Sequence, residues 1–286
     1  MPKVTRANPR SPRAKAKEPA KSDAAQTKPP GAWAIYLDLS QRPLQVLIFL
    51  LPLLILYELG TLLFLDTDGM REIVRARLML TQLLDAFGAV GFHLPPILLT
   101  VVLLCWHAAY KPKPEYPKSS FRGDVMVGMG LESFLWAVAL VVIGAILANG
   151  LGTKLLPFAQ TGPVGAGSPP AELGLMARLT LSIGAGLYEE LVFRWMLIAF
   201  VHFVLADLLR TGEHWAYGVA IALSAVTFAF YHNVRMGPGA ELHLPLLITY
   251  VMGGAYFAII FVLRGFGIVV ASHALYDVIA LAILAR

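Results

Sequence analysis

Long apolar segments separated by short polar ones run through most of the chain, starting near residue 43. A segment of about 20 apolar residues is long enough to cross the hydrocarbon core of a bilayer as a helix. The pattern therefore predicts an all-α protein, a polytopic bundle of seven or eight transmembrane helices. The predicted apolar ranges are 43–65, 87–110, 125–148, 173–209, 216–232, 244–263 and 266–284.

Two of these ranges have features that a simple span does not have. Pro95 and Pro96 predict a kink or a broken start in the second range. The range 173–209 is too long for one straight span, because a helix of that length would reach about 55 Å across a core of roughly 30 Å. We expect either a span with an interfacial or re-entrant continuation, or two spans with a tight break.

Composition and charge agree with a membrane protein. Charged residues make up 14% of the chain, whereas globular domains carry about 25%. Eight Lys or Arg residues lie in the tail 1–32, against Glu18 and Asp23, and four more lie in 111–122. This bias predicts a cytoplasmic N-terminus rather than a nucleic-acid-binding protein. The predicted parts are a disordered basic tail (1–32), N-terminal membrane helices (33–150) and a C-terminal membrane domain (151–286).

Three charges lie close together in the apolar range 173–209. Glu189, Glu190 and Arg194 fall within six residues, and each charge at the centre of a membrane helix costs roughly 2.5–3.5 kcal/mol unless it finds a partner. Glu190 and Arg194 share a helix face and can form an ion pair that only holds helices together. Glu189 points about 100° away and needs a different partner, so it is the better candidate for a general base.

Polar residues on two later apolar ranges are the natural partners. Phe228 and His232 lie four residues apart near the end of one range, and His273 and Asp277 lie four apart within another. Each pair alone fits a packed or hydrogen-bonded role. Three such elements on separate spans all need partners in the bilayer, and this favours one shared site. Glu132, near the start of 125–148, either snorkels to the interface or supports that site.

The three motifs in this order resemble the CPBP family of intramembrane proteases, which includes type II CAAX prenyl proteases and lysostaphin-resistance-protein-A-like proteins. They read Glu-Glu-x-x-x-Arg, Phe-x-x-x-His and His-x-x-x-Asp, and the resemblance covers about 173–286. It implies an integral membrane endopeptidase, here expected in a bacterial cell membrane. By this likeness Glu189 activates a water with help from His232, whereas His273 and Asp277 polarise the scissile carbonyl. Glu190, Arg194 and Phe228 fill supporting positions.

One motif position departs from the pattern of the family. Family proteases often carry Asn where this chain has Asp277, and an ionised Asp cannot donate a hydrogen bond to an oxyanion. Asp277 then stays protonated, orients His273, or helps to hold a metal. Glu189, His232 and His273 would make an open zinc site with water as the fourth ligand. A divalent metal such as zinc and a metal-free glutamate mechanism therefore both remain open.

The expected partners are the lipid bilayer and a membrane-embedded or lipidated protein substrate. Nothing in the residues shows that the substrate is prenylated. The main alternative is a proteolytically inactive protein of the same fold that acts as a scaffold or immunity factor by binding another membrane protein. A transporter with an ion relay is a third hypothesis, but it predicts repeated halves, and the sequence shows none.

Overall fold

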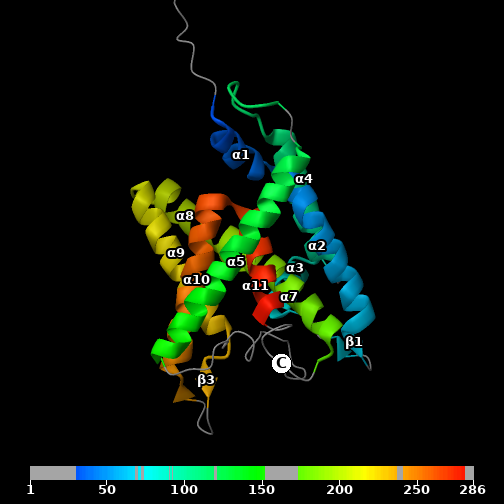
Figure 1. Cartoon of the computed structure of the whole chain (residues 1–286), viewed down its shortest axis with the longest axis vertical. Helices are drawn as coiled ribbons and strands as arrows, with labels where there is room; N and C mark the ends of the chain where they lie inside the picture. Colours follow the sequence, from blue (N-terminus) through cyan, green and yellow to red (C-terminus); the bar gives the residue numbers. More distant parts are fainter. Residues whose placement is uncertain are drawn as a thin grey trace, which may run out of the picture.

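The computed structural model describes residues 30–67, 70–71, 74–89, 91, 93–118, 121–151, 173–236 and 241–280. Most of these residues are helical, and two short β-hairpins connect some of the helices (Figure 1). The predicted tail 1–32 falls almost wholly outside the described residues, as does most of the connector after residue 151. The elements are α1 (Ala32–Ser40), α2 (Pro43–Phe64), β1 (Asp66–Thr67), β2 (Met70–Arg71), α3 (Arg75–Ala86), α4 (Leu94–Ala109), α5 (Gly123–Leu151), α7 (Leu175–Glu190), η2 (Leu191–Met196), α8 (Leu197–His202), η3 (Phe203–Leu208), α9 (Glu213–Tyr231), β3 (Arg235–Met236), β4 (Glu241–Leu242), α10 (Leu244–Arg264) and α11 (Phe266–Asp277).

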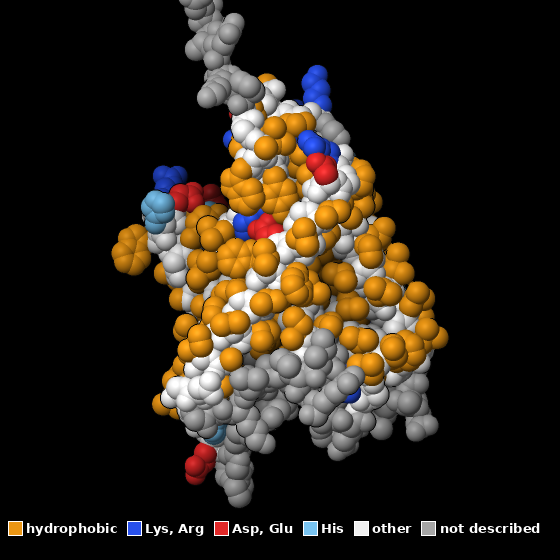
Figure 2. Space-filling model, viewed as in Figure 1, with side chains coloured by type: hydrophobic (Ala, Val, Ile, Leu, Met, Phe, Trp, Pro, Cys, Tyr) orange, Lys and Arg blue, Asp and Glu red, His pale blue; other side chains and the backbone are white. Residues whose placement is uncertain are grey.

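The predicted all-α membrane bundle is confirmed in its class. Among the described residues, five helical segments are long and apolar enough to cross a membrane: α2, α5, the run Leu175–Leu208, α9 and α10. Two shorter apolar helices, Leu94–Ala109 and Phe266–Ala280, fall below that length. The predicted number of seven or eight spans is therefore not confirmed. Many large hydrophobic side chains are exposed on the outer helices, and Figure 2 shows them covering the flanks of the bundle, as lipid contact requires.

The long apolar range after residue 172 forms one continuous helical run instead of two spans with a break. It spans 34 residues, Leu175–Leu208, about 51 Å at the usual helical rise. Two π-helical segments, η2 and η3, interrupt its α-helical winding. A π segment keeps the backbone helical while widening the turn, so the run changes its winding without leaving the helix. In the second predicted range, the two prolines occupy the first turn of α4, and the helix begins at Leu94.

Helix α11 lies at the centre of the bundle. Nearly all of its residues are buried, and it packs most extensively on α7 and α5 (Figure 1). Gly186 of α7 permits this close approach: a Cβ at this position would lie 2.7 Å from the backbone nitrogen of Ala274 and 2.8 Å from the carbonyl oxygen of Val270. The contact brings the end of α7, with its two glutamates, against the middle of α11.

The bundle has two distinct ends. We call the end with α1 and the connector 110–122 the N-terminal end, and the end with both hairpins the opposite end (Figure 1). Hydrogen bonds tie the first end together, since Arg42 donates to the carbonyl of Pro117 at 2.7 Å and Gln45 to that of Arg122 at 3.1 Å. At the opposite end, Arg75 of α3 donates to the carbonyl of Tyr231 at 2.8 Å.

Two polar clusters stabilise the bundle outside the predicted site. Near the N-terminal end, Glu132 pairs with Arg264 and accepts a hydrogen bond from Tyr36 at 2.5 Å. Two roles were expected for Glu132, snorkelling to the interface or supporting the site. In the structure it instead joins helices through an internal ion pair. Towards the opposite end, Glu58 pairs with the buried Arg77 at 3.0 Å and ties α3 to α2.

Candidate active site

The two adjacent glutamates occupy the last positions of α7. Glu189 and Glu190 are both fully buried, as is Arg194 in the following π segment. Glu190 Oε2 lies 3.1 Å from Arg194 Nε, so the expected pair four residues apart is present. Arg194 also places its guanidinium 4.2 Å from the ring centre of Phe228 and donates to the carbonyl of Gly254 at 3.3 Å. The cation therefore fastens α7 and η2 to α9 and α10.

Glu190 also holds the histidine of α11. Its Oε1 lies 2.6 Å from His273 Nδ1, and a carboxylate accepts, so Nδ1 carries the hydrogen. The ring of His273 stacks on Phe257 with centroids 4.4 Å apart. The hydrogen bond and the stacking fix the ring, with Nε2 directed away from Glu190. Nε2 then lies 3.6 Å from Asp277 Oδ2 and 4.0 Å from Glu189 Oε2.

His232 approaches the same oxygen from α9. Its Nε2 lies 3.8 Å from Glu189 Oε2, and its Nδ1 lies 2.8 Å from the carbonyl oxygen of Phe228. A carbonyl only accepts, so Nδ1 is the protonated nitrogen and the lone pair of a neutral His232 is on Nε2. Stacking on Tyr250, with centroids 4.2 Å apart, holds the ring in this position.

The structure brings together all four predicted catalytic residues. Glu189 Oε2 faces both imidazoles at distances too long for a direct hydrogen bond, and it has no hydrogen-bond partner among the described residues. His232, His273 and Asp277 are 6, 4 and 8% exposed, respectively. A buried carboxylate oxygen without a hydrogen bond requires an explanation, and functional sites are where such atoms occur.

Sequence reasoning missed three side chains that shape this site. The hydroxyl of Tyr231 donates a long hydrogen bond, 3.4 Å, to Glu189 Oε1. Arg75 binds the backbone of the same tyrosine from α3. Ser224 donates to the carbonyl of Phe193 inside the π segment at 2.8 Å. Tyr231 directly precedes His232, which is a local signal, whereas the contacts of Arg75 and Ser224 depend on tertiary packing.

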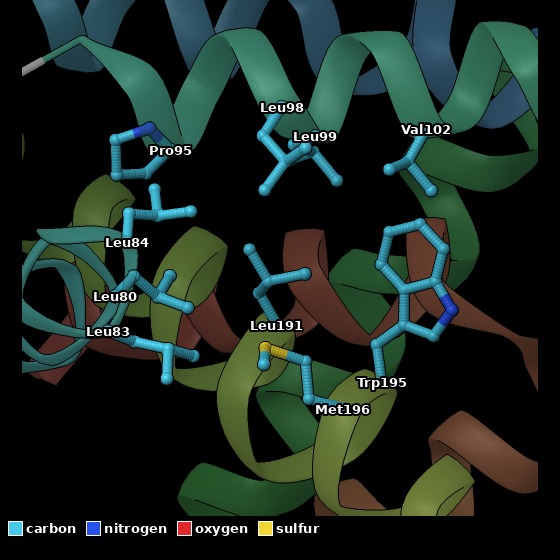
Figure 3. A pocket seen from close by; sticks show the side chains of 10 residues that line it. All are labelled: Leu80, Leu83, Leu84, Pro95, Leu98, Leu99, Val102, Leu191, Trp195 and Met196. Carbon is cyan, nitrogen blue, oxygen red and sulfur yellow. The ribbon is translucent and has the colours of Figure 1, made fainter. Parts of the chain in front are cut away.

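An apolar cavity of about 230 Å³ lies beside the π segment that follows the glutamates (Figure 3). Leu191 and Trp195 of η2 line one side, and Leu99 and Val102 of α4 face them across it. Leucines of α3 close a further side. Leu191 directly follows Glu190, so an apolar chain in this cavity would lie near the supporting residues of the site.

The residues proposed as zinc ligands do not fit a metal site. Among the described residues, no group of three or more His, Cys, Asp or Glu side chains is arranged to hold a metal ion. Glu189 Oε2 lies 3.8 and 4.0 Å from the two imidazole nitrogens, whereas tetrahedral ligands about 2.0–2.1 Å from zinc lie closer to one another. The expected zinc site therefore has no support in the geometry, and we derive no reaction step through a metal.

Comparison with known proteins places this part of the chain in a family. Residues 171–279 match the family model described as Rce1-like, type II CAAX prenyl endopeptidase Rce1-like. The matched range contains α7, η2, α9 and α11, and with them all four predicted catalytic residues. No curated protein and no solved structure matches the chain. With the three motifs in the family order on buried helices, residues 171–279 thus match the CAAX-type endopeptidase family, in agreement with the CPBP resemblance of the sequence.

Proposed function

We propose that this protein is an intramembrane endopeptidase that hydrolyses a peptide bond in a membrane-associated or lipidated protein. The family match over 171–279 supports a peptidase of the CAAX type. The exposed hydrophobic side chains on the outer helices support a location in the bilayer. A substrate anchored in the same bilayer then reaches the site by lateral diffusion.

One observation carries the proposal: the position of Glu189 Oε2 between the two histidines. The oxygen lies 3.8 Å from His232 Nε2 and 4.0 Å from His273 Nε2, deep in the bundle and without a hydrogen bond. These separations suit one bridging water better than direct contacts. An ion pair that served only stability would have closed to about 2.8 Å.

In this proposal Glu189 and His232 activate the water. The carboxylate of Glu189 takes a proton from the water as its oxygen attacks the scissile carbonyl carbon. His232, with its Nδ1 hydrogen committed to the carbonyl of Phe228, accepts a hydrogen bond from the second O–H of the water at Nε2 and so orients the attacking lone pair. When the C–N bond breaks, Glu189 returns the proton to the leaving amine, so the products are one new amine and one new carboxylic acid, which keeps the second hydrogen of the water until it ionises in solution.

His273 stabilises the charge that develops on the carbonyl oxygen. This requires a hydrogen on Nε2 in addition to the one on Nδ1, that is, an imidazolium. The carboxylates of Glu190, at 2.6 Å, and Asp277, at 3.6 Å, flank the ring and favour that form. A donor fixed before the reaction and shielded from water is an effective stabiliser of an oxyanion.

Asp277 acts on His273 in this scheme. The three expected roles were protonation, orientation of His273 and metal binding. Its distance of 3.6 Å to His273 Nε2 fits a charge that holds the imidazolium without occupying its hydrogen. Nε2 then keeps its hydrogen for the oxyanion, and Asp277 itself donates nothing.

The test compares protein termini in host membranes that express wild type or Glu189→Gln at matched abundance. Gln keeps the size of the side chain but cannot accept the proton, so new termini should appear with wild type alone. These termini would also identify the substrate. If no termini differ between the two membranes while the biological effect survives the substitution, the chain is a scaffold and the proposal fails.

A further inference from the structure

A second cavity, of about 280 Å³, lies at the N-terminal end of the bundle, where the end of α1 meets the end of α4. None of the four predicted catalytic residues lines it. Its volume is just below the range of about 300–1,000 Å³ that holds drug-sized ligands, so it suits a headgroup-sized ligand. One carboxylate and five aromatic side chains dominate its lining: Asp38, Trp106, Tyr110, Trp195, Phe261 and Phe266.

The aromatic rings form a group drawn from separate elements. Trp195 of η2 lies 6.2 Å from Trp106 of α4 and 4.9 Å from Phe266 of α11, measured between ring centres. The face of an aromatic ring attracts a cation within about 6 Å of its centre, and tryptophan does so most strongly. The protein already uses one such contact here, since the guanidinium of Arg42 lies 5.8 Å from the ring centre of Tyr110.

The carboxylate of Asp38 is held so that its two oxygens differ. Arg42 binds Oδ2 through two nitrogens, at 2.8 and 2.6 Å. Arg42 is buried and also donates to the carbonyl of Pro117, so it holds Asp38 from the protein side. The other oxygen, Oδ1, receives a long hydrogen bond of 3.5 Å from the hydroxyl of Tyr110. Oδ1 can therefore accept a stronger donor.

The polar atoms of the lining are mainly acceptors. Gln41, which also lines the cavity, donates its amide nitrogen to the carbonyl of Leu263 at 3.4 Å, and its own carbonyl oxygen remains an acceptor. With Asp38 Oδ1 and the hydroxyl oxygen of Tyr110, the lining offers three acceptor oxygens. A primary ammonium has three N–H donors, whereas a quaternary ammonium has none. The lining therefore favours a primary ammonium.

The position of the cavity indicates where such an ammonium comes from. Tyr110 caps the apolar helix α4, so the cavity lies where an apolar helix meets a polar connector, the level at which lipid headgroups and aromatic side chains gather. Lys111 and Lys113 follow Tyr110 and are exposed. Basic side chains at this level attract lipid phosphate. An aminophospholipid carries both groups that these residues would bind.

We propose that the cavity binds the primary ammonium of a bilayer phospholipid, phosphatidylethanolamine. Its phosphate lies beside Lys111 and Lys113, and its chains follow the exposed apolar side chains of α4. Trp195 also lines the apolar cavity of Figure 3 and directly follows Arg194, so the bound headgroup contacts the π segment that follows the two glutamates. This binding does not depend on the proposed peptidase function.

Native mass spectrometry of the delipidated full chain in detergent tests the proposal. The protein is titrated with phosphatidylethanolamine, phosphatidylcholine or phosphatidylglycerol of identical chains, so that the lipids differ only in the headgroup. We expect phosphatidylethanolamine to bind about tenfold more tightly than phosphatidylglycerol, which has no ammonium, and more tightly than phosphatidylcholine. Equal affinity for phosphatidylethanolamine and phosphatidylglycerol overturns the site, and equal affinity for phosphatidylcholine overturns the primary ammonium.

Variants then locate the preference in the cavity. Asp38→Asn should abolish it, and Trp106→Leu should reduce it about fivefold, as expected for the loss of one cation–π contact. Trp106 is 45% exposed, so this variant keeps the fold and decides the matter if Asp38→Asn does not fold. Trp215→Leu is the matched control, since Trp215 is 78% exposed and lies outside the cavity. An unchanged preference in Trp106→Leu, or an equal loss in Trp215→Leu, overturns the proposal.

Discussion

Glu132 and Glu189 are both carboxylates inside apolar helices, but their surroundings differ. Arg264 binds both oxygens of Glu132, at 2.5 and 2.8 Å, and the indole of Trp136 and the hydroxyl of Tyr36 add one hydrogen bond each. Burial, followed by the hydrogen bond to Glu132, raises the pKa of Tyr36, so that phenol remains a donor. By contrast, Oε2 of Glu189 has no hydrogen bond among the described residues.

On the proposed mechanism, this contrast separates a carboxylate with a structural role from one with a catalytic role. A carboxylate with a structural role is paired with cations and hydrogen-bond donors, because an unsatisfied buried charge is costly. Glu189 instead has two imidazoles at 3.8 and 4.0 Å, a spacing that leaves room for a reacting molecule. The neighbouring Glu190, by contrast, is paired with Arg194 and His273. The two classes of carboxylate thus lie side by side at the end of α7.

The largest effect is expected for Glu189→Gln. The amide cannot accept a proton from water, so the cleavage rate of the identified substrate should fall by about 10³-fold. Because Gln fills the same volume and removes a buried charge that has no hydrogen bond at Oε2, thermal unfolding in detergent should stay close to that of wild type. A rate within a few-fold of wild type would refute the role of Glu189.

Glu132→Gln is the matched control. It removes the same charge from a closed cluster, leaving Arg264 without its ion pair, and should destabilise the fold by about 2 kcal/mol. The cleavage rate per folded molecule should remain at the wild-type level. If both variants lost rate in proportion to their folded fraction, the distinction between the two clusters would fail.

A smaller loss is expected for Glu190→Gln. The substitution removes the carboxylate that orients His273 through Nδ1, and a misplaced imidazole costs roughly 10²-fold in rate. Single-turnover cleavage, normalised to folded protein, would measure this loss. Glu190→Gln should also lower stability, since Arg194 is then buried without an ion pair; a loss of stability with an unchanged rate would limit Glu190 to a structural role.

Tyr231→Phe should have a modest effect. The hydroxyl is 3.4 Å from Glu189 Oε1, a long hydrogen bond worth about 1 kcal/mol, and its removal should slow cleavage roughly fivefold. Substrate affinity should not change, because the hydroxyl contacts Glu189 and not a binding surface. Steady-state kinetics separate the two quantities, and an effect confined to KM would contradict the positioning role.

No loss of rate is expected when purified enzyme is treated with a chelator. The described side chains offer no three-ligand group for a metal, so cleavage should continue at its original rate after exhaustive dialysis against the chelator. Metal content measured on the same sample serves as the control. Inactivation by the chelator that zinc reverses would restore the zinc hypothesis for Glu189, His232 and His273.

Hydropathy predicted helix positions well because each apolar span must satisfy its backbone hydrogen bonds within its own helix. Predicted and observed bounds agree closely for α2, at 43–65 against Pro43–Phe64, and for α10, at 244–263 against Leu244–Arg264. Pro95 and Pro96 occupy the first turn of α4, where proline is well tolerated, and the helix begins at Leu94 instead of at residue 87. The π segments were not predictable, since their winding depends on tertiary contacts such as that of Ser224.

The cluster of site residues was predictable for a different reason. Charged and polar groups in separate apolar spans must meet partners, so Glu189, His232 and His273 were expected to converge. The residue pattern alone does not indicate which carboxylate forms a hydrogen bond with the imidazole of His273. Glu190 does so at 2.6 Å, because Gly186 lets α7 approach α11 closely enough. Packing distances of this kind appear only in three dimensions.

The central position of α11 has a consequence for biosynthesis. The ribosome completes Glu189 long before His273 and Asp277, which follow about ninety residues later, a delay of several seconds at usual rates of synthesis. During that interval the carboxylate has neither the imidazole of His273 nor the helix that covers it. On the proposed mechanism, a nascent or truncated chain is therefore a silent, zymogen-like form, and insertion of α11 completes the site.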